Sequence, residues 1–133
     1  MNNSISSALK KQNQKNGPVL SFYERLADVR ESVGFDYICE ADKPLAHECC
    51  LIICEVLMRP RGEIMIDGEL CDAGSVAAVF ASLNYEHIQH VCDRFNLISH
   101  EVKRKKQYLR TALYNAFFEL EASAINDAAV GLL

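Results

Sequence analysis

The residues best suited to chemistry form a row of cations near the C-terminus. At about 100° per residue on an α-helix, five side chains fall within about 100° of arc: Lys103, Lys106, Gln107, Arg110 and Tyr114. Arg104 stands beside them in the sequence. Such a row matches the phosphates of a nucleic-acid backbone, and an aromatic side chain at its end can stack on a base. The pattern predicts DNA binding. The alternative is a solvated helix face, which normally carries lysine and arginine.

Patterns for catalysis or metal binding are weak. Two groups of metal-ligand side chains lie close together on expected helices: His47, Cys50 and Cys54, and His87, His90 and Cys92. Neither group has the paired CxxC or HxxxH spacing of a zinc site. The sequence also lacks a glycine-rich phosphate loop and a GxSxG motif. Glu48 and Glu55 are expected at the wet edge of their helix. We therefore expect no enzymatic activity, no metal and no other cofactor.

These side chains depend on helices for their placement, because apolar residues recur at helical spacing along most of the chain. Asp42, Asp72 and Asn84 are expected N-caps, and Pro44 falls in a first turn, where its missing N–H is harmless. Helices are predicted over 19–32, from Asp42 to Arg59, over 72–82, from Asn84 through Phe95, and from near Val102 onward.

Residues 63–71 follow a different pattern. Apolar residues alternate on both sides of Asp67-Gly68, and this dipeptide favours the type I′ turn, which requires positive φ at both central residues. A two-stranded hairpin is marginal by itself, so it should pack against the helices. The expected fold class is therefore mainly α: a small helical bundle of about five helices with one short β-hairpin.

The composition fits a single domain. Half of the 133 residues are apolar and 24% are charged, which suffices for one core. Residues 1–17 are polar and predict a flexible leader or linker, followed by a single helical domain over 18–133. The longest uncharged apolar run, 49–54, is too short to span a membrane, and no signal-peptide pattern is present. We expect a cytoplasmic protein with no membrane contact and reduced cysteines.

The net charge of −4 is distributed unevenly. Residues 18–98 carry −8 and residues 117–133 carry −3, whereas residues 1–17 carry +3 and residues 99–116 carry +4. The bulk charge does not favour nucleic acid, but the local basic stretch does. The acidic region and an apolar C-terminal segment favour a different function, that of a protein-interaction module. The apolar residues of that segment are Ala128, Ala129, Val130, Leu132 and Leu133.

A distinctive motif stands near the C-terminus: Tyr108-Leu109-Arg110-Thr111-Ala112-Leu113-Tyr114-Asn115-Ala116. It resembles the Tyr-Leu-x-Thr-Ala-Leu-Tyr-Asn-Ala motif of a domain of unknown function at the C-terminus of replication initiator protein A from plasmids and conjugative elements. Earlier segments resemble the same domain in order: residues 30–38, the hairpin residues 66–69, and Leu83, His87, Ile88 and Val91. The resemblance runs from about Phe22 to Asp127. The family has proline after Asn-Ala, where this chain has Phe117-Phe118, so the last helix is expected to run on.

The resemblance implies an accessory role in replication initiation on a mobile element, with DNA and replication proteins such as a helicase loader as partners. The family's winged-helix DNA-binding domain has no counterpart here, so origin recognition is not expected. A more distant resemblance is to the C-terminal domains of DnaD-like primosomal proteins. Tyr108, Leu109 and Leu113 match their Tyr-Ile-x-x-Ile-Leu-x-x-Trp helix, whereas Ala112 and Ala116 replace the Ile and the Trp.

Much of the motif also suits a structural role. Its apolar members occupy core positions: Leu109, Ala112, Leu113 and Ala116. Its polar members can form hydrogen bonds to neighbouring loops: Thr111, Tyr114 and Asn115. The first hypothesis is therefore non-specific binding of DNA, including single-stranded DNA, through the cations. The second is a protein-interaction module that recruits a helicase loader or mediates self-association.

Overall fold

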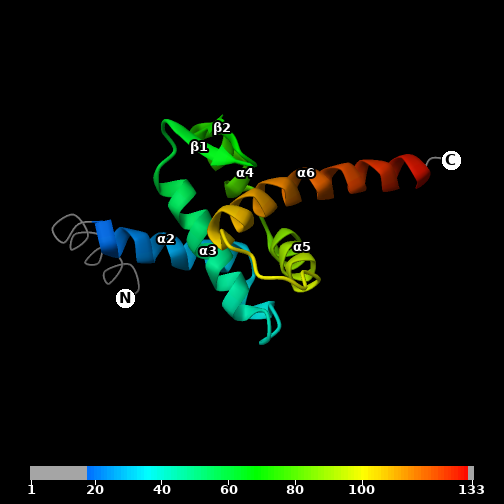
Figure 1. Ribbon diagram of the computed structural model, residues 1–133, viewed down its shortest axis with the longest axis horizontal. Helices are drawn as coiled ribbons and strands as arrows, with labels where there is room; N and C mark the ends of the chain where they lie inside the picture. Colours follow the sequence, from blue (N-terminus) through cyan, green and yellow to red (C-terminus); the bar gives the residue numbers. More distant parts are fainter. Residues whose placement is uncertain (1–17, 132–133) are drawn as a thin grey trace, which may run out of the picture.

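The computed structural model describes residues 18–131 (Figure 1). In chain order the elements are α2 (Pro18–Ser32), the 3-10 helix η1 (Phe35–Tyr37), α3 (Lys43–Met58), β1 (Glu63–Ile66), β2 (Glu69–Asp72), α4 (Ala73–Ala81), α5 (Tyr85–Asn96) and α6 (Lys105–Gly131). Five α-helices and one antiparallel hairpin over this part of the chain confirm the expected mainly α bundle. The expected leader, 1–17, lies outside the described residues.

Helix α3 forms the centre of the bundle, because it contacts α2, α4, α5 and α6. Its residues Cys49, Cys50 and Cys54 are fully buried and pack as small hydrophobic side chains. Burial raises the pKa of Cys50 to about 11, and it also raises the pKa of Cys49 and of Cys54. Cys92 of α5 joins the same core, and burial raises its pKa to about 12. All four thiols are therefore protonated at neutral pH.

The start of α3 differs from the expected cap in one detail. Pro44 does occupy the first turn, and Asp42 stands at the N-cap position, but the Asp42 side chain forms no cap hydrogen bond. Its carboxylate instead accepts hydrogen bonds from Asn96 (2.9 Å), Cys39 (3.3 Å) and Gln89 (3.4 Å). These bonds, that of Asn96 first, lower the pKa of Asp42. The carboxylate thus ties α3 to α5.

The hairpin β1–β2 forms at the predicted position with the predicted turn. Asp67 and Gly68 have φ values of 52° and 79°, the left-handed region that a type I′ turn requires. Ile66 pairs with Glu69 across the turn and is buried. The backbone N–H of Asp67 donates a 2.9 Å hydrogen bond to Oγ1 of Thr111 on α6. The hairpin is therefore fastened to the helices, as its marginal stability in isolation requires.

The N-caps predicted for α4 and α5 are confirmed. The side chains of Asp72 and Asn84 each accept a hydrogen bond from a backbone N–H in the first turn of their helix, at 2.9 and 3.0 Å. On α5 the capping is reciprocal, because Nδ1 of His87 accepts a hydrogen bond from the backbone N–H of Asn84 at 3.0 Å. His87 is buried, and its ring stacks on Phe117 of α6. Burial lowers the pKa of His87, which favours the neutral imidazole.

The start of α6 was predicted too early. Val102 fits the apolar spacing of the helix, yet the chain through residues 103–104 forms a turn, and α6 begins at Lys105. The backbone N–H of Tyr108 donates to the carbonyl of Arg104, at 2.9 Å. Apolar spacing misplaced the start because a half-buried side chain such as Val102 can reach the core from a loop as well as from a helix.

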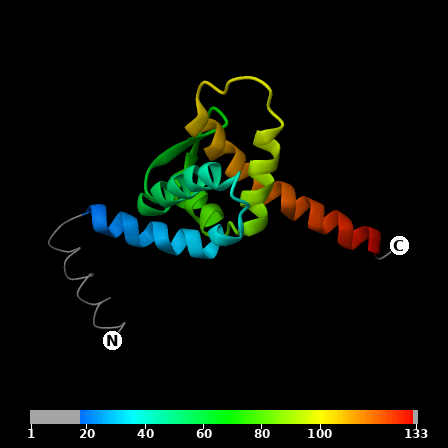
Figure 2. The same ribbon diagram turned by 90° about the horizontal axis from the view of Figure 1, so that it is seen from below.

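Helix α6 consists of two unlike halves. In the first half, Leu109, Leu113 and Ala116 are at most 1% exposed. In the second half every residue from 121 to 128 is exposed, and the helix extends away from the other elements (Figures 1 and 2). The helix runs on past Phe117-Phe118, as expected. Although α6 has 27 residues, no helix among the described residues is both long and apolar enough to cross a bilayer.

Candidate nucleic-acid interface

One groove gathers cations from segments far apart in the sequence. It lies between α2, the end of α3, β1 and the first turns of α6, and its volume is about 880 Å³. Its charged side chains are Arg59, Arg61, Lys106, Arg110, Glu55 and Glu63. The groove therefore has a net charge of +2 in a chain whose net charge is −4. We name this surface the cationic groove.

Each cation is positioned by a simple local feature. Arg59 and Arg61 flank the proline that follows α3; proline cannot continue a helix, so the chain turns away here and exposes both arginines. Lys106 and Arg110 lie one turn apart on α6 and therefore share a face of that helix. Tyr23 of α2, which is 62% exposed, lines the same groove.

The remainder of the groove is apolar. Val56 and Ala73 are buried, and Phe22, Met58 and Ile64 are half-buried and pack against the core. A cationic rim over an apolar floor suits a ligand that combines negative charge with apolar or aromatic surface. A nucleic-acid strand has both, in its phosphates and its bases.

Two ion pairs anchor the first turn of α6 on α3. Nζ of Lys105 lies 2.8 Å from Oε2 of Glu48, and Nζ of Lys106 lies 2.7 Å from Oε2 of Glu55. Both glutamates stay solvent-accessible, with side chains 42% and 45% exposed, as expected for the wet edge of their helix, and α6 crosses that edge. The side chains of Lys106 and Glu55 are 57% and 45% exposed. Exposed pairs of this kind are worth about 0–1 kcal/mol, so a phosphate can compete for Lys106.

Arg110 is the least exposed cation of the groove. Its side chain is half-buried, and its Nε atom is buried without a hydrogen-bond partner among the described residues. A buried N–H donor without an acceptor costs free energy. Because this Nε atom has almost no exposed surface, contact between Arg110 and a phosphate would involve the part of its side chain that lines the groove.

The residues predicted to bind DNA are not presented as one row. Lys106 and Arg110 line the cationic groove, and the other four do not: Lys103, Arg104, Gln107 and Tyr114. The first two precede α6, so the helical spacing does not extend to them. Gln107 is exposed, whereas Tyr114 is half-buried with its ring centroid 5.1 Å from that of Phe118.

The motif residues divide between the core and a second, smaller pocket. The apolar members are core or half-buried residues: Leu109, Ala112, Leu113 and Ala116. Three polar members, Tyr108, Thr111 and Asn115, line a pocket of about 230 Å³. The ring of Tyr108 also meets Phe95 edge-on, with 5.9 Å between centroids. This half of the motif faces the hairpin and α5.

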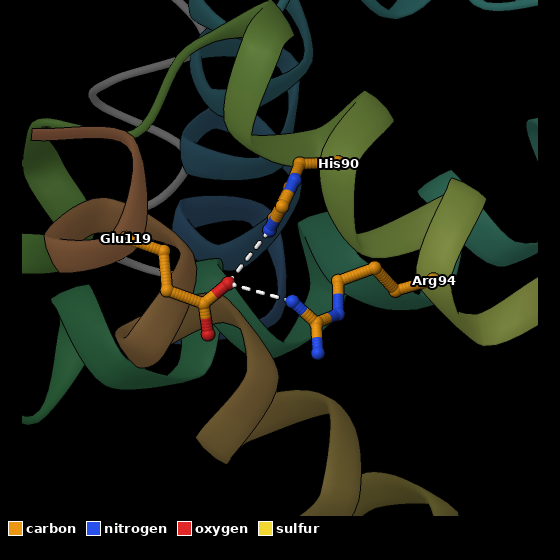
Figure 3. A network of polar contacts seen from close by, with 3 residues as sticks. All are labelled: His90, Arg94 and Glu119. Carbon is orange, nitrogen blue, oxygen red and sulfur yellow. Dashed lines mark hydrogen bonds and ion pairs between the residues drawn. The ribbon is translucent and has the colours of Figure 1, made fainter. Parts of the chain in front are cut away.

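The second pocket joins three elements. It is lined by Asp67 of the hairpin turn and by residues of α5 and α6, so segments that carry the resemblance come together around it. Oε2 of Glu119 on α6 accepts a 3.0 Å hydrogen bond from Nη1 of Arg94 and lies 2.8 Å from Nε2 of His90, both on α5 (Figure 3). Together with the bond between Asp67 and Thr111, this network holds the elements in place.

The sequence did not single out Tyr23, Arg59 and Arg61 as functional residues. They join Lys106 and Arg110 only because α2 and the α3–β1 connection pack beside α6. The Arg-Pro-Arg that follows an apolar helix is the one local pattern that could have drawn attention to two of them. No local pattern marks Tyr23 as their neighbour.

The two groups of possible metal ligands do not form sites. Within residues 18–131, no three His, Cys, Asp or Glu side chains that the structure describes come together in a way that could hold a metal ion. Nδ1 of His47 instead lies 2.6 Å from a guanidinium nitrogen of Arg30, and Cys50 and Cys54 lie in the core.

No family model matches the chain, and no curated protein or solved structure matches it either. The resemblance to the replication initiator domain thus stays a prediction from the sequence.

Proposed function

We propose that this chain is a non-catalytic accessory domain of a replication initiator, acting in the cytoplasm, that binds DNA non-specifically through the cationic groove. The observation that carries the proposal is the convergence of Arg59, Arg61, Lys106 and Arg110 on one groove with an apolar floor. The resemblance of residues 108–116 to the initiator domain is the reason for proposing a role in replication initiation.

The groove chemistry favours single-stranded over duplex DNA. The cations can neutralise the phosphates of either form. The bases of a single strand are also free to stack on Tyr23 and to contact the apolar floor, whereas a duplex keeps its bases paired. Arg110 lines the groove, and Lys106 can exchange Glu55 for a phosphate. Single-stranded DNA, as exposed at an opened origin, is therefore the preferred ligand.

Salt dependence is the first test. Fluorescence anisotropy with labelled oligonucleotides gives the association constant at several salt concentrations. If the four cations of the groove each neutralise one phosphate, the logarithm of that constant falls against the logarithm of salt concentration with a slope of about −2.8 for a single strand and about −3.6 for a duplex. Binding that is independent of salt contradicts the proposal.

Matched variants test the position of the site. Replacing Arg59 and Arg61 together with alanine removes two of the four cations, so the single-strand slope should fall to about −1.4 and the affinity should decrease. Replacing Arg25 and Lys43 together with alanine changes the net charge equally, but neither residue lines the groove. This control should retain the full slope. Equal losses in the two double variants would place DNA binding elsewhere.

A second candidate function is the recruitment of another replication protein, such as a helicase loader. The second half of α6 favours it, because residues 121–128 are exposed and include Ile125, which is 66% exposed. Exposed apolar residues on a projecting helix are typical of an interaction surface. Pulldown with purified primosomal proteins tests this function, and Ile125→Ala should weaken the capture.

A further inference from the structure

The second half of α6 is a helix without packing partners among the described residues. Residues 121–128 are exposed on every side, and the preceding turn adds Phe118, which is 47% exposed. Helices in proteins gain most of their stability from an apolar face packed on another surface, and a few isolated turns are only marginally helical in water. We therefore expect another surface to cover this segment when the protein is at work.

The apolar and acidic residues in the second half of α6 indicate what kind of surface would bind it. Phe118, Ala122 and Ile125 follow the i, i+4, i+7 spacing and share one face of α6. Glu121 lies at the edge of this face. The segment 117–131 contains no lysine or arginine, and its charged residues are all acidic: Glu119, which already pairs with Arg94 of α5, and Glu121 and Asp127. An apolar stripe with negative charge requires a receptor with an apolar floor and cations at its rim.

The cationic groove is such a receptor. Its floor is apolar, and its four cations outnumber its two carboxylates. The groove of the same molecule is out of reach, because α2 and the hairpin lie toward one end of the structure and the C-terminal end of α6 lies at the other (Figures 1 and 2). The N-terminal residues 1–17 carry +3 and do not complement a basic surface.

We infer that the second half of α6 docks into the cationic groove of a second copy of this chain. The inference rests on the protein-interaction function and names its partner. The helix and the groove are different surfaces, so the contact is heterologous. Two copies form a closed dimer only if each inserts its α6 into the groove of the other, and otherwise further copies add head to tail. The second copy and DNA occupy the same groove, so self-association covers the DNA-binding surface and DNA dissociates the assembly.

The first experiment measures self-association of the full chain by sedimentation over a concentration series. The wild type should associate with rising concentration, less at high salt and less with an added single-stranded oligonucleotide. Ile125→Ala should raise the dissociation constant at least tenfold. Leu97→Ala is the matched control, because Leu97 is 83% exposed, directly follows α5 and belongs to neither surface, and it should change nothing. A wild type that stays monomeric throughout overturns the inference.

Charge exchange is the sharper test. Glu121→Lys and Arg61→Glu should each weaken self-association, because each places like charges at the contact, and the combined variant should restore it. Circular dichroism is the control, and it should show that these exposed substitutions leave the fold intact. If the combined variant fails to associate, the docking arrangement is wrong.

DNA binding separates this inference from the other proposals. Ile125→Ala should bind DNA at least as tightly as the wild type, because Ile125 lies outside the groove and a second copy no longer competes for it. A monomeric chain that still captures a helicase loader, and loses it on Ile125→Ala, overturns the second copy as the occupant but retains the protein-interaction function. A monomeric chain with salt-dependent DNA binding overturns only the docking.

Discussion

Replacing Thr111 with valine removes one hydrogen-bond acceptor and keeps the shape of the side chain. Oγ1 of Thr111 accepts the 2.9 Å hydrogen bond from the backbone N–H of Asp67, which fastens the hairpin turn to α6. Asp67 is exposed, so water can solvate the N–H that is set free, and the cost is that of one lost hydrogen bond. That cost is about 0.5–1.5 kcal/mol. Valine and threonine have similar helix propensities, so α6 itself adds little to the change in unfolding free energy.

Thr111→Ser is the matched control. It keeps the hydroxyl and loses a methyl group, which would cost about 0.8 kcal/mol if fully buried and costs less here because Thr111 is half-buried. Urea denaturation measures the unfolding free energy of both variants, and hydrogen exchange at the Asp67 amide separates the two effects. The amide should lose protection in the valine variant and retain it in the serine variant. Full protection with valine would refute the assignment of Thr111 as a fastening residue.

Two further predictions concern titration and thiol reactivity. Burial lowers the pKa of His87 below its ordinary value of about 6.5, so the unfolded chain binds a proton at higher pH than the folded chain does. His87 therefore contributes stability that is present above about pH 6.5 and is lost as the pH falls through its folded pKa. The urea midpoint of the wild type should decrease as the pH falls through the folded pKa of His87. His87→Gln retains a capping acceptor and should show a smaller decrease. The same pH dependence in that variant would contradict the assignment of His87 as the titrating group. With a thiol reagent at neutral pH, Cys39 and Cys71 should react quickly and the four buried cysteines only on unfolding, because burial keeps those thiols protonated and inaccessible. Rapid reaction of all six would disprove the buried core of α3.

The local elements followed from short stretches of sequence. Asp72 and Asn84 marked the starts of their helices, because a side-chain oxygen that caps first-turn N–H groups acts within a few residues. Asp67-Gly68 fixed the hairpin turn for the same reason, since positive φ is a property of those two residues. The start of α6 was missed because Val102 satisfies the apolar spacing from a loop. Local sequence signals therefore predicted which elements form. They failed at the start of α6, where an apolar side chain in a loop has the spacing expected of a helix.

The sequence by itself determined a mainly α bundle, the helix caps at Asp72 and Asn84, the hairpin and the presence of a basic stretch near residues 103–110. Only the tertiary structure decided which of those cations share a surface. Packing of α6 across α3 paired Lys106 with Glu55 and brought Lys106 and Arg110 beside Arg59 and Arg61. The same packing left residues 121–128 exposed on every side. Helical spacing specifies which side chains share a face of one helix, but a groove is formed by several elements, and their relative placement depends on the fit of the whole core.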